Sequence, residues 1–256
     1  MDTAAEIIET MMEMRDDGQA RHLMRFFKTG KGEYGEGDRF LGLKVPQTRM
    51  VVKAARKDMT FSEIEKMLYC PWHEIRLAGF LLLVNAMKEA TLPRKSRSST
   101  SDAQRRDAVA AFYLKHVRQA NNWDLVDLSC PKILGEWLLR PGADGRMPDR
   151  NVLDTLAASD NLWEQRTSIV STLQLIRQRQ YDDTLRIAAK LLEHTHDLIH
   201  KATGWMLREI GKKDKNTLVN FLETNHDKMP RTALRYAIEK MDHDERNYWL
   251  NRQTHA

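Results

Sequence analysis

The chain has 256 residues, of which 41 are Lys or Arg and 36 are Asp or Glu, so its formal net charge is +5. This length suits one domain with a substantial core, and no apolar run reaches the ~18 residues of a membrane-spanning helix. Acidic residues near Met1 exclude an apolar signal segment, and two cysteines are too few for a disulfide framework. We therefore expect a cytoplasmic protein, in the cytosol or nucleoid of a bacterium, that has no membrane partner.

The first break in the helical pattern is a segment from Lys28 to Val45 that contains five glycines. It is not a Walker-type phosphate loop, because the Gly-Lys-Ser/Thr ending is missing and Glu33, Glu36 and Asp38 would repel a phosphate. We predict a structured turn that packs against the first helices.

From there on, apolar residues recur at spacings of three and four, which is the pattern of amphipathic helices. We expect helices that include residues 64–68, 77–84, 169–176 and 185–192. Ser62 and Glu65 form a candidate capping box at the start of the first of these. Four prolines stand at the front of helical patterns, where proline is tolerated: Pro46, Pro71, Pro131 and Pro230. Because no long stretch alternates apolar and polar residues, the sequence predicts an all-α fold.

Two further segments break the pattern. Leu92 to Asp102 is rich in serine and basic residues and predicts a surface loop between helices. Pro141 to Pro148 contains Gly142 and is a shorter break of the same kind.

The helices come as short pairs, and four of them align around one anchor position. The anchors are Arg76, Asp127, Arg166 and Lys201, which are 51, 39 and 35 residues apart. These intervals are close to the ~40–47-residue period of HEAT and armadillo repeats. The sequence therefore predicts a single domain over residues 1–256, built as a right-handed solenoid (superhelix) of HEAT-like helical repeats with a concave basic groove.

Three of the four anchors are basic, so they would line that groove with charges that attract DNA phosphates. Asp127 is the exception, and a carboxylate in such a groove needs a reason. It lies four residues after Trp123, so the two share one face of a helix. An indole and a carboxylate together stabilise a cationic transition state, and Arg166 could hold a neighbouring phosphate.

Several short segments stand out along the chain, in this order: 32–38 (GEYGEGD), 40–46 (FLGLKVP) with Arg49, 122–127 (NWDLVD), 163–166 (WEQR), 196–201 (HDLIHK) and 204–209 (GWMLRE). Together, and over most of the chain from about Phe26 to Tyr236, they resemble the motifs of the AlkD-like DNA alkylation-repair family. The resemblance implies a HEAT-like fold and an enzyme that removes alkylated purines from double-stranded DNA. It also implies that the lesion is held against the groove rather than in a deep pocket.

By this resemblance, the catalytic candidates are Trp123, Asp127, Arg166 and Trp205. A purine alkylated at N3 or N7 is positively charged and leaves as a neutral base, so aromatic faces and one carboxylate suffice. We therefore expect a monofunctional glycosylase that works as a monomer without cofactor or metal. The DNA-binding candidates are Lys201, Arg208, Arg49, Arg76 and Arg231.

The simpler readings remain open at this stage. A tryptophan at the front of a repeat helix is more often core or rim packing, and Arg166 or Lys201 could be solvated helix charges. His194, His196 and His200 have a spacing that suits metal ligands, but no cysteine or carboxylate cluster completes a site. As a whole, the chain could also be a non-catalytic helical-repeat module that binds nucleic acid, or a scaffold for another protein.

Overall fold

The computed structural model describes residues 1–92 and 99–252 of the chain, and its secondary structure is helical. Throughout these ranges there is no β-strand, and only an isolated bridge pairs Arg39 with Trp72. The all-α prediction is therefore confirmed. In the same ranges, no helix is both long enough and apolar enough to cross a membrane.

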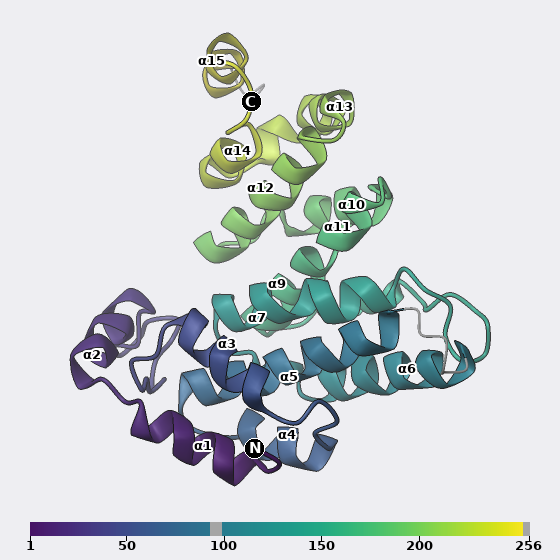
Figure 1. Ribbon diagram of the computed structural model, residues 1–256. Coiled ribbons are helices and arrows are strands. Elements are labelled where there is room, and N and C mark those ends of the chain that lie inside the picture. Colours follow the sequence, from purple (N-terminus) through teal and green to yellow (C-terminus); the bar gives the residue numbers. More distant parts are fainter. Residues whose placement is uncertain (93–98, 253–256) are drawn as a thin grey trace. The chain divides into compact units, whose positions relative to one another are not determined.

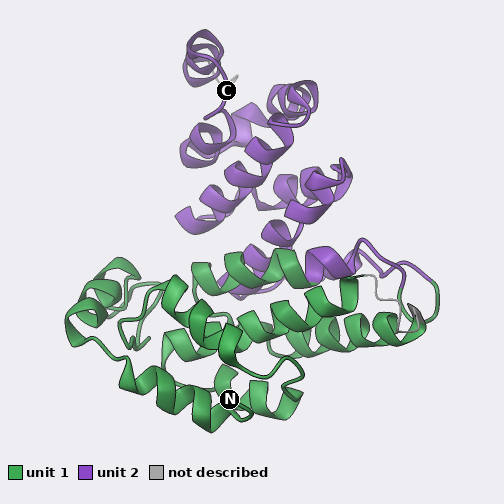
Figure 2. Ribbon diagram, viewed as in Figure 1, with its two compact units in different colours: residues 1–133, 142–145 green, residues 134–141, 146–256 purple. Residues whose placement is uncertain are grey.

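The helices divide between two compact units, which Figure 2 shows in different colours. Unit 1 comprises residues 1–133 and 142–145, and unit 2 comprises residues 134–141 and 146–256. The helices of unit 1 are α1 (Ala4–Glu13), α2 (Asp17–Phe26), α3 (Val45–Ala54), α4 (Phe61–Leu68), α5 (His73–Thr91), α6 (Ser99–Lys115) and α7 (Trp123–Cys130). Those of unit 2 are α8 (Asn151–Ala157), α9 (Leu162–Ser171), α10 (Leu173–Arg177), α11 (Asp182–Leu191), α12 (Asp197–Gly211), α13 (Lys215–Asn225), α14 (Arg231–Ala237) and α15 (His243–Asn251).

The core of unit 1 is built around α5, which contacts α3, α4, α6 and α7 (Figure 1). Every residue from His73 to Val84 is buried, so this helix has no solvent-facing side over its first three turns. A helix surrounded in this way must hold any charged side chain in an ion pair or hydrogen bond.

The core of unit 2 is built around α12, which contacts α9, α11, α13 and α14. The most extensive contact of α12 is with α14, and the two helices run beside each other in Figure 1. A Cβ added at Gly204 would lie 2.4 Å from the carbonyl oxygen of Ala233. The glycine at this position is therefore what allows the two helix backbones to come this close.

The predicted helix starts need two corrections. The residue that caps α4 is Thr60, whose hydroxyl accepts a hydrogen bond from the Glu63 N–H, so the capping box at Ser62 is wrong by two positions. Pro131 does not begin a separate α-helix: it is the first residue of a π-helical segment, η2 (Pro131–Gly135), which continues directly from the last residue of α7. Pro46 and Pro230 do stand at helix fronts, and Pro71 lies just before α5.

The predicted loops have mixed outcomes. Residues 28–44 are irregular, with turns, as expected. Of the loop predicted over 92–102, residues 93–98 lie outside the described residues, and residues 99–102 form the first turn of α6. The stripe over 169–176 spans two helices, because α9 ends at Ser171 and α10 begins at Leu173.

The anchor alignment has a structural counterpart in three helices. Asp127, Arg166 and Lys201 are each the fifth residue after an N-cap, which is Asn122, Asn161 or His196. Arg76 is instead the fourth residue after Trp72, the N-cap of α5. One residue corresponds to about 100° around a helix, so Arg76 is turned by about that angle, relative to its own N-cap, from the position that the other three anchors occupy on their helices.

Candidate active site

Trp123 and Asp127 lie on the same accessible face of α7. The side-chain oxygen of Asn122 accepts a hydrogen bond from the Trp123 N–H at 2.9 Å and so caps the helix. The three residues between Trp123 and Asp127 are buried, whereas these two are partly exposed. Residues four apart share a helix face. An indole ring and a carboxylate are therefore presented together on α7, as the sequence predicted.

The indole of Trp123 is held at the end of a column of stacked rings. It stacks on Phe27 with a centroid distance of 5.2 Å, and Phe27 stacks on Phe40 at 5.0 Å. Phe40 in turn stacks on the imidazole of His73 at 4.3 Å, and Phe26 meets the indole edge-on at 6.0 Å. Offset and edge-on ring pairs add stability beyond the area they bury. The position of Trp123 is thus fixed by residues from three other parts of unit 1: the end of α2, the glycine-rich segment and the start of α5.

His73 at the far end of this column is a buried cation between two carboxylates. Its Nδ1 lies 2.8 Å from Asp38 and its Nε2 lies 2.9 Å from Asp124, so both ring nitrogens donate. Burial alone would lower the pKa of His73, but the charges and hydrogen bonds of Asp124 and Asp38 raise it to about 9. Burial would likewise raise the pKa of Asp38, but His73 and Arg76 hold it below its usual value. This cation ties the glycine-rich segment to the first turn of α7.

Glu74, the next residue, explains why the glycine-rich segment has a defined shape. Its buried carboxylate accepts hydrogen bonds from the backbone N–H groups of Leu41, Gly42 and Leu43 at 2.8, 2.9 and 3.1 Å. Gly42 has a φ of +92°, and a Cβ there would lie 2.2 Å from the carbonyl oxygen of Asp16. A side chain other than hydrogen therefore cannot be accommodated at Gly42 without moving α2.

Arg76 does not have the accessible position that was expected of a phosphate-binding residue. It is 5% exposed, donates to Asp38 at 2.5 Å and donates to the carbonyl of Cys70 at 3.0 Å. The physical reason is the burial of α5 on all sides, which requires an internal partner for each charge. We therefore withdraw Arg76 from the DNA-binding candidates and assign it to the network around His73.

In unit 2, three of the candidates share one side of α12. Lys201, Trp205 and Arg208 are spaced by four and three residues and are all partly exposed, whereas Ile199 and Met206 are buried. Lys201 forms an ion pair with Asp197 at 2.7 Å, and Arg208 is paired with Glu239 and Glu209. This side of α12 combines an indole with two cations.

The remaining candidates have different environments. Arg166 on α9 is buried, and its guanidinium donates to the carbonyl of Leu198 in the first turn of α12. Arg231 is exposed at the start of α14 and donates to the carbonyl of Leu250 at 2.7 Å. Arg49 is exposed on α3. Arg166 thus contributes to holding α9 against α12, whatever else it contacts.

The three histidines near α12 are occupied by hydrogen bonds. The Nε2 of His200 donates to the backbone carbonyl of His194. His194 is 2.9 Å from the side-chain oxygen of Gln165 and accepts from the backbone of His196, and His196 caps α12 by accepting from Leu198. Within residues 1–92 and 99–252, no group of three His, Cys, Asp or Glu side chains is placed to hold a metal ion.

Comparison with known proteins identifies the family. The model of the family described as DNA alkylation repair enzyme matches residues 7–241. The chain belongs to this family. Its role is therefore in the repair of alkylation damage, and its substrate is DNA. Among solved structures, a protein described as a predicted DNA alkylation repair enzyme from Enterococcus faecalis matches with a TM-score of 0.63 and 16% identity, over 90% of this chain and 97% of that one. No curated protein matches the chain.

The catalytic candidates of this DNA alkylation repair family member are divided between the two units. Trp123 and Asp127 are in unit 1, and Arg166 and Trp205 are in unit 2. Their convergence on one patch stays a prediction.

The sequence reasoning missed the residues that fix Trp123 in this family member. It assigned no role to His73 and Glu74, and for the glycine-rich segment it predicted only a structured turn packed against the first helices. A signal was present, because an adjacent histidine and glutamate begin a helix whose next ten residues, up to Val84, are apolar except for Arg76. Buried charges require partners, and Asp38 in the glycine-rich segment was available as one.

Proposed function

We propose that the protein is a monofunctional DNA glycosylase. Its substrates would be positively charged purines alkylated at N3 or N7, such as 3-methyladenine and 7-methylguanine, in double-stranded DNA. The products would be the free base and an abasic site. Family membership supports the action on alkylated DNA, and the residues of α7 supply groups that suit this reaction.

The chemistry follows from the charge of the lesion. The bond between C1′ and the purine nitrogen breaks with both electrons leaving on the base, which neutralises the charge of the base. The sugar develops positive charge, which the carboxylate of Asp127 and the face of Trp123 would stabilise. A water molecule adds its oxygen to C1′ and gives a proton to Asp127, which releases it to solvent. No general acid is needed for the departing base.

The observation that carries the proposal is the shared accessible face of Trp123 and Asp127 on α7. The indole is pre-positioned by the rings of Phe27 and Phe40 and by the ion pairs of His73. Pre-positioned groups lose little entropy when substrate binds, which favours catalysis over simple recognition.

We also propose roles for the remaining candidate residues in binding DNA. We propose that Trp205 faces the lesion, and that Lys201, Arg208, Arg49 and Arg231 contact the DNA backbone, as accessible cations do. Arg166 is as buried as Arg76, so we propose that it supports the first turn of α12 rather than contacting the phosphate as the sequence predicted. The two units would then act as one HEAT-like repeat domain on a single duplex. We propose a monomer that works in the cytosol without a cofactor.

The test is release of free base from DNA that contains 7-methylguanine. We expect Asp127→Asn to lower the single-turnover rate by about 10²-fold or more, because a fixed charge beside the reacting sugar is lost. Affinity for undamaged DNA should be unchanged or slightly higher, because a charge that repels phosphate is removed. Asp17→Asn is the matched control, since Asp17 is an exposed carboxylate of unit 1 outside this face.

Two outcomes would overturn the proposal. Equal rates for the wild type and Asp127→Asn would exclude the mechanism. DNA binding with no base release by the wild type would favour a non-catalytic nucleic-acid-binding module.

A further inference from the structure

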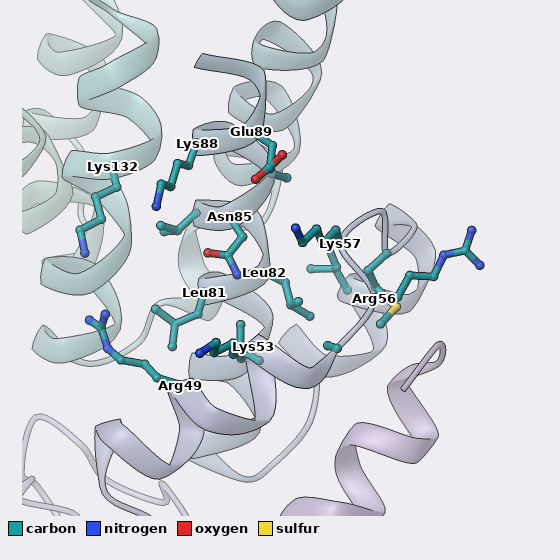
Figure 3. A pocket seen from close by; sticks show the side chains of 16 residues that line it. Arg49, Lys53, Arg56, Lys57, Leu81, Leu82, Asn85, Lys88, Glu89 and Lys132 are labelled. Atoms are coloured by element: carbon teal, nitrogen blue, oxygen red, sulfur yellow. The ribbon is translucent and has the colours of Figure 1, made fainter. Parts of the chain in front are cut away.

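A concave feature lies in unit 1, between α3, the start of α4 and α5. It is a pocket of about 330 Å³ (Figure 3). We call it the α3–α5 pocket. Its lining residues are Arg49, Val52, Lys53, Ala55, Arg56, Lys57, Met59, Ile64, Leu81, Leu82, Val84, Asn85, Ala86, Lys88, Glu89 and Lys132.

The floor of the α3–α5 pocket is apolar. Val52, Ile64, Leu81 and Leu82 line it, and each belongs to the buried core. They come from α5 and from the two helices that it contacts, α3 and α4. The floor is therefore set by the core of unit 1 and exists before any ligand binds.

The rim of the α3–α5 pocket is strongly basic. Arg49, Lys53, Lys57 and Lys88 line it, and Figure 3 shows Lys132 beside them from the segment after α7. Among the described residues, no carboxylate lies within 4.0 Å of the charged groups of the first four. Glu89 is the one acidic residue of the lining.

This arrangement works against the stability of α3. Arg49 and Lys53 are four residues apart on that helix, where like charges repel and destabilise it. By contrast, Arg56 points away from the pocket in Figure 3 and pairs with Asp58. Arg49, Lys53, Lys57 and Lys88 have no carboxylate partner among the described residues and lie above an apolar floor, which suits an anion that also has an apolar part.

We propose that the α3–α5 pocket binds one nucleotide unit, with its phosphate on the rim cations and its base or sugar on the apolar floor. Arginine offers a planar pair of donors to phosphate oxygens, and lysine offers a mobile point charge. The volume is at the lower end of small-molecule pockets, which are about 300–1,000 Å³. It therefore suits one unit rather than a stacked duplex.

This nucleotide has two possible sources with the same chemistry. It is either an unstacked nucleotide of a DNA strand or a free mononucleotide. The strand source rests on the proposed function, since it assumes that DNA reaches this unit. The free source does not.

The experiment compares two pocket variants with a matched control. Asn85→Trp fills the space from an exposed position on α5, and Lys53→Gln combined with Lys88→Gln removes two rim charges. Lys66→Gln combined with Lys115→Gln removes the same charge from exposed positions of unit 1 outside the pocket. Thermal melting of each variant checks that it is folded.

Three probes are titrated at several salt concentrations: a labelled single-stranded oligonucleotide, deoxyguanosine 5′-monophosphate and inorganic phosphate. For a strand source, both pocket variants should weaken oligonucleotide binding about tenfold, and the double lysine variant should lower the salt slope by about 1–1.5. If the ligand is a free mononucleotide, deoxyguanosine 5′-monophosphate should bind the wild type more tightly than inorganic phosphate does, and both pocket variants should lose this binding.

The proposal is overturned if the pocket variants bind both the oligonucleotide and the mononucleotide with the same affinity as the control variant. It is also overturned if inorganic phosphate binds as tightly as the mononucleotide and Asn85→Trp leaves both affinities unchanged, because the apolar floor would then contribute nothing to binding. Base release is measured separately on the wild type. If the wild type releases no base, the glycosylase proposal is wrong, but binding of a nucleotide that depends on the α3–α5 pocket would still stand.

Discussion

The carboxylate of Glu74 offers the sharpest test of how the glycine-rich segment is held. It is 2% exposed and accepts three backbone N–H groups, those of Leu41, Gly42 and Leu43, on two oxygens. Glu74→Gln keeps the shape of the side chain but replaces one acceptor oxygen with an NH₂ group and removes the charge.

The magnitude follows from these contacts. In the best orientation, the amide oxygen replaces Oε1 and keeps Gly42 and Leu43, while the NH₂ group faces the N–H of Leu41. The hydrogen bond from Leu41 is lost, and those from Gly42 and Leu43 are then made to a neutral amide oxygen instead of a charged carboxylate. Since a hydrogen bond to a charged group contributes about 1.5–3 kcal/mol, we expect the free energy of unfolding to fall by about 2–4 kcal/mol. For a chain of this size, that lowers the melting temperature by roughly 5–15 °C.

Urea and thermal denaturation measure the loss of global stability in Glu74→Gln, and amide hydrogen exchange measures the loss of local stability in the glycine-rich segment. Leu41, Gly42 and Leu43 should exchange much faster in Glu74→Gln than in the wild type. Glu9→Gln, at an exposed position on α1, is the control and should stay within about 0.5 kcal/mol of the wild type.

A small effect would refute the reasoning. If Glu74→Gln lost less than about 1 kcal/mol and its three amides stayed protected, a single buried hydrogen bond to charge could not have the value assigned to it. The shape of the glycine-rich segment would then rest on its own turns.

The other predictions concern the ion-pair network, helix packing and the lesion-facing ring. The pKa of His73 is about 9 in the folded protein and ordinarily 6.5, so its contribution of roughly 3 kcal/mol to the free energy of unfolding is complete below pH 6.5 and is lost as the pH rises through 9. Urea titrations at pH 6.5, 7.5 and 9 should show this fall, and a His73→Gln variant with the same pH dependence would contradict it. Gly204→Ala should cost about 1–3 kcal/mol in denaturation experiments, because the added Cβ meets the backbone of Ala233. Gly211→Ala is its control, since that Cβ meets only the flexible end of a leucine side chain, and equal losses for the two would argue against a close approach of α12 and α14. Trp205→Ala should reduce the preference for methylated over plain DNA in competition binding more than it reduces plain-DNA affinity, and an unchanged preference would remove Trp205 from the site.

The sequence by itself determined the helical architecture and the pairing of Trp123 with Asp127. Both depend on the period of one helix, which is a local property that residues three and four apart express directly. The motifs also sufficed for the family, because several short segments in a fixed order are visible without coordinates. The position of Asp127, Arg166 and Lys201 five residues after their N-caps is likewise a local property that the sequence determines.

Only the tertiary structure decided what the charges of α5 do. Asp38 and Asp124 reach His73 across 35 and 51 residues, and Glu74 reaches its donors across 31–33 residues. Helical periodicity carries no information about such distant partners, and on a helix buried on every side it does not separate an inward charge from an outward one. Arg76 was therefore assigned to DNA from its place in the repeat, although burial had already committed it to Asp38.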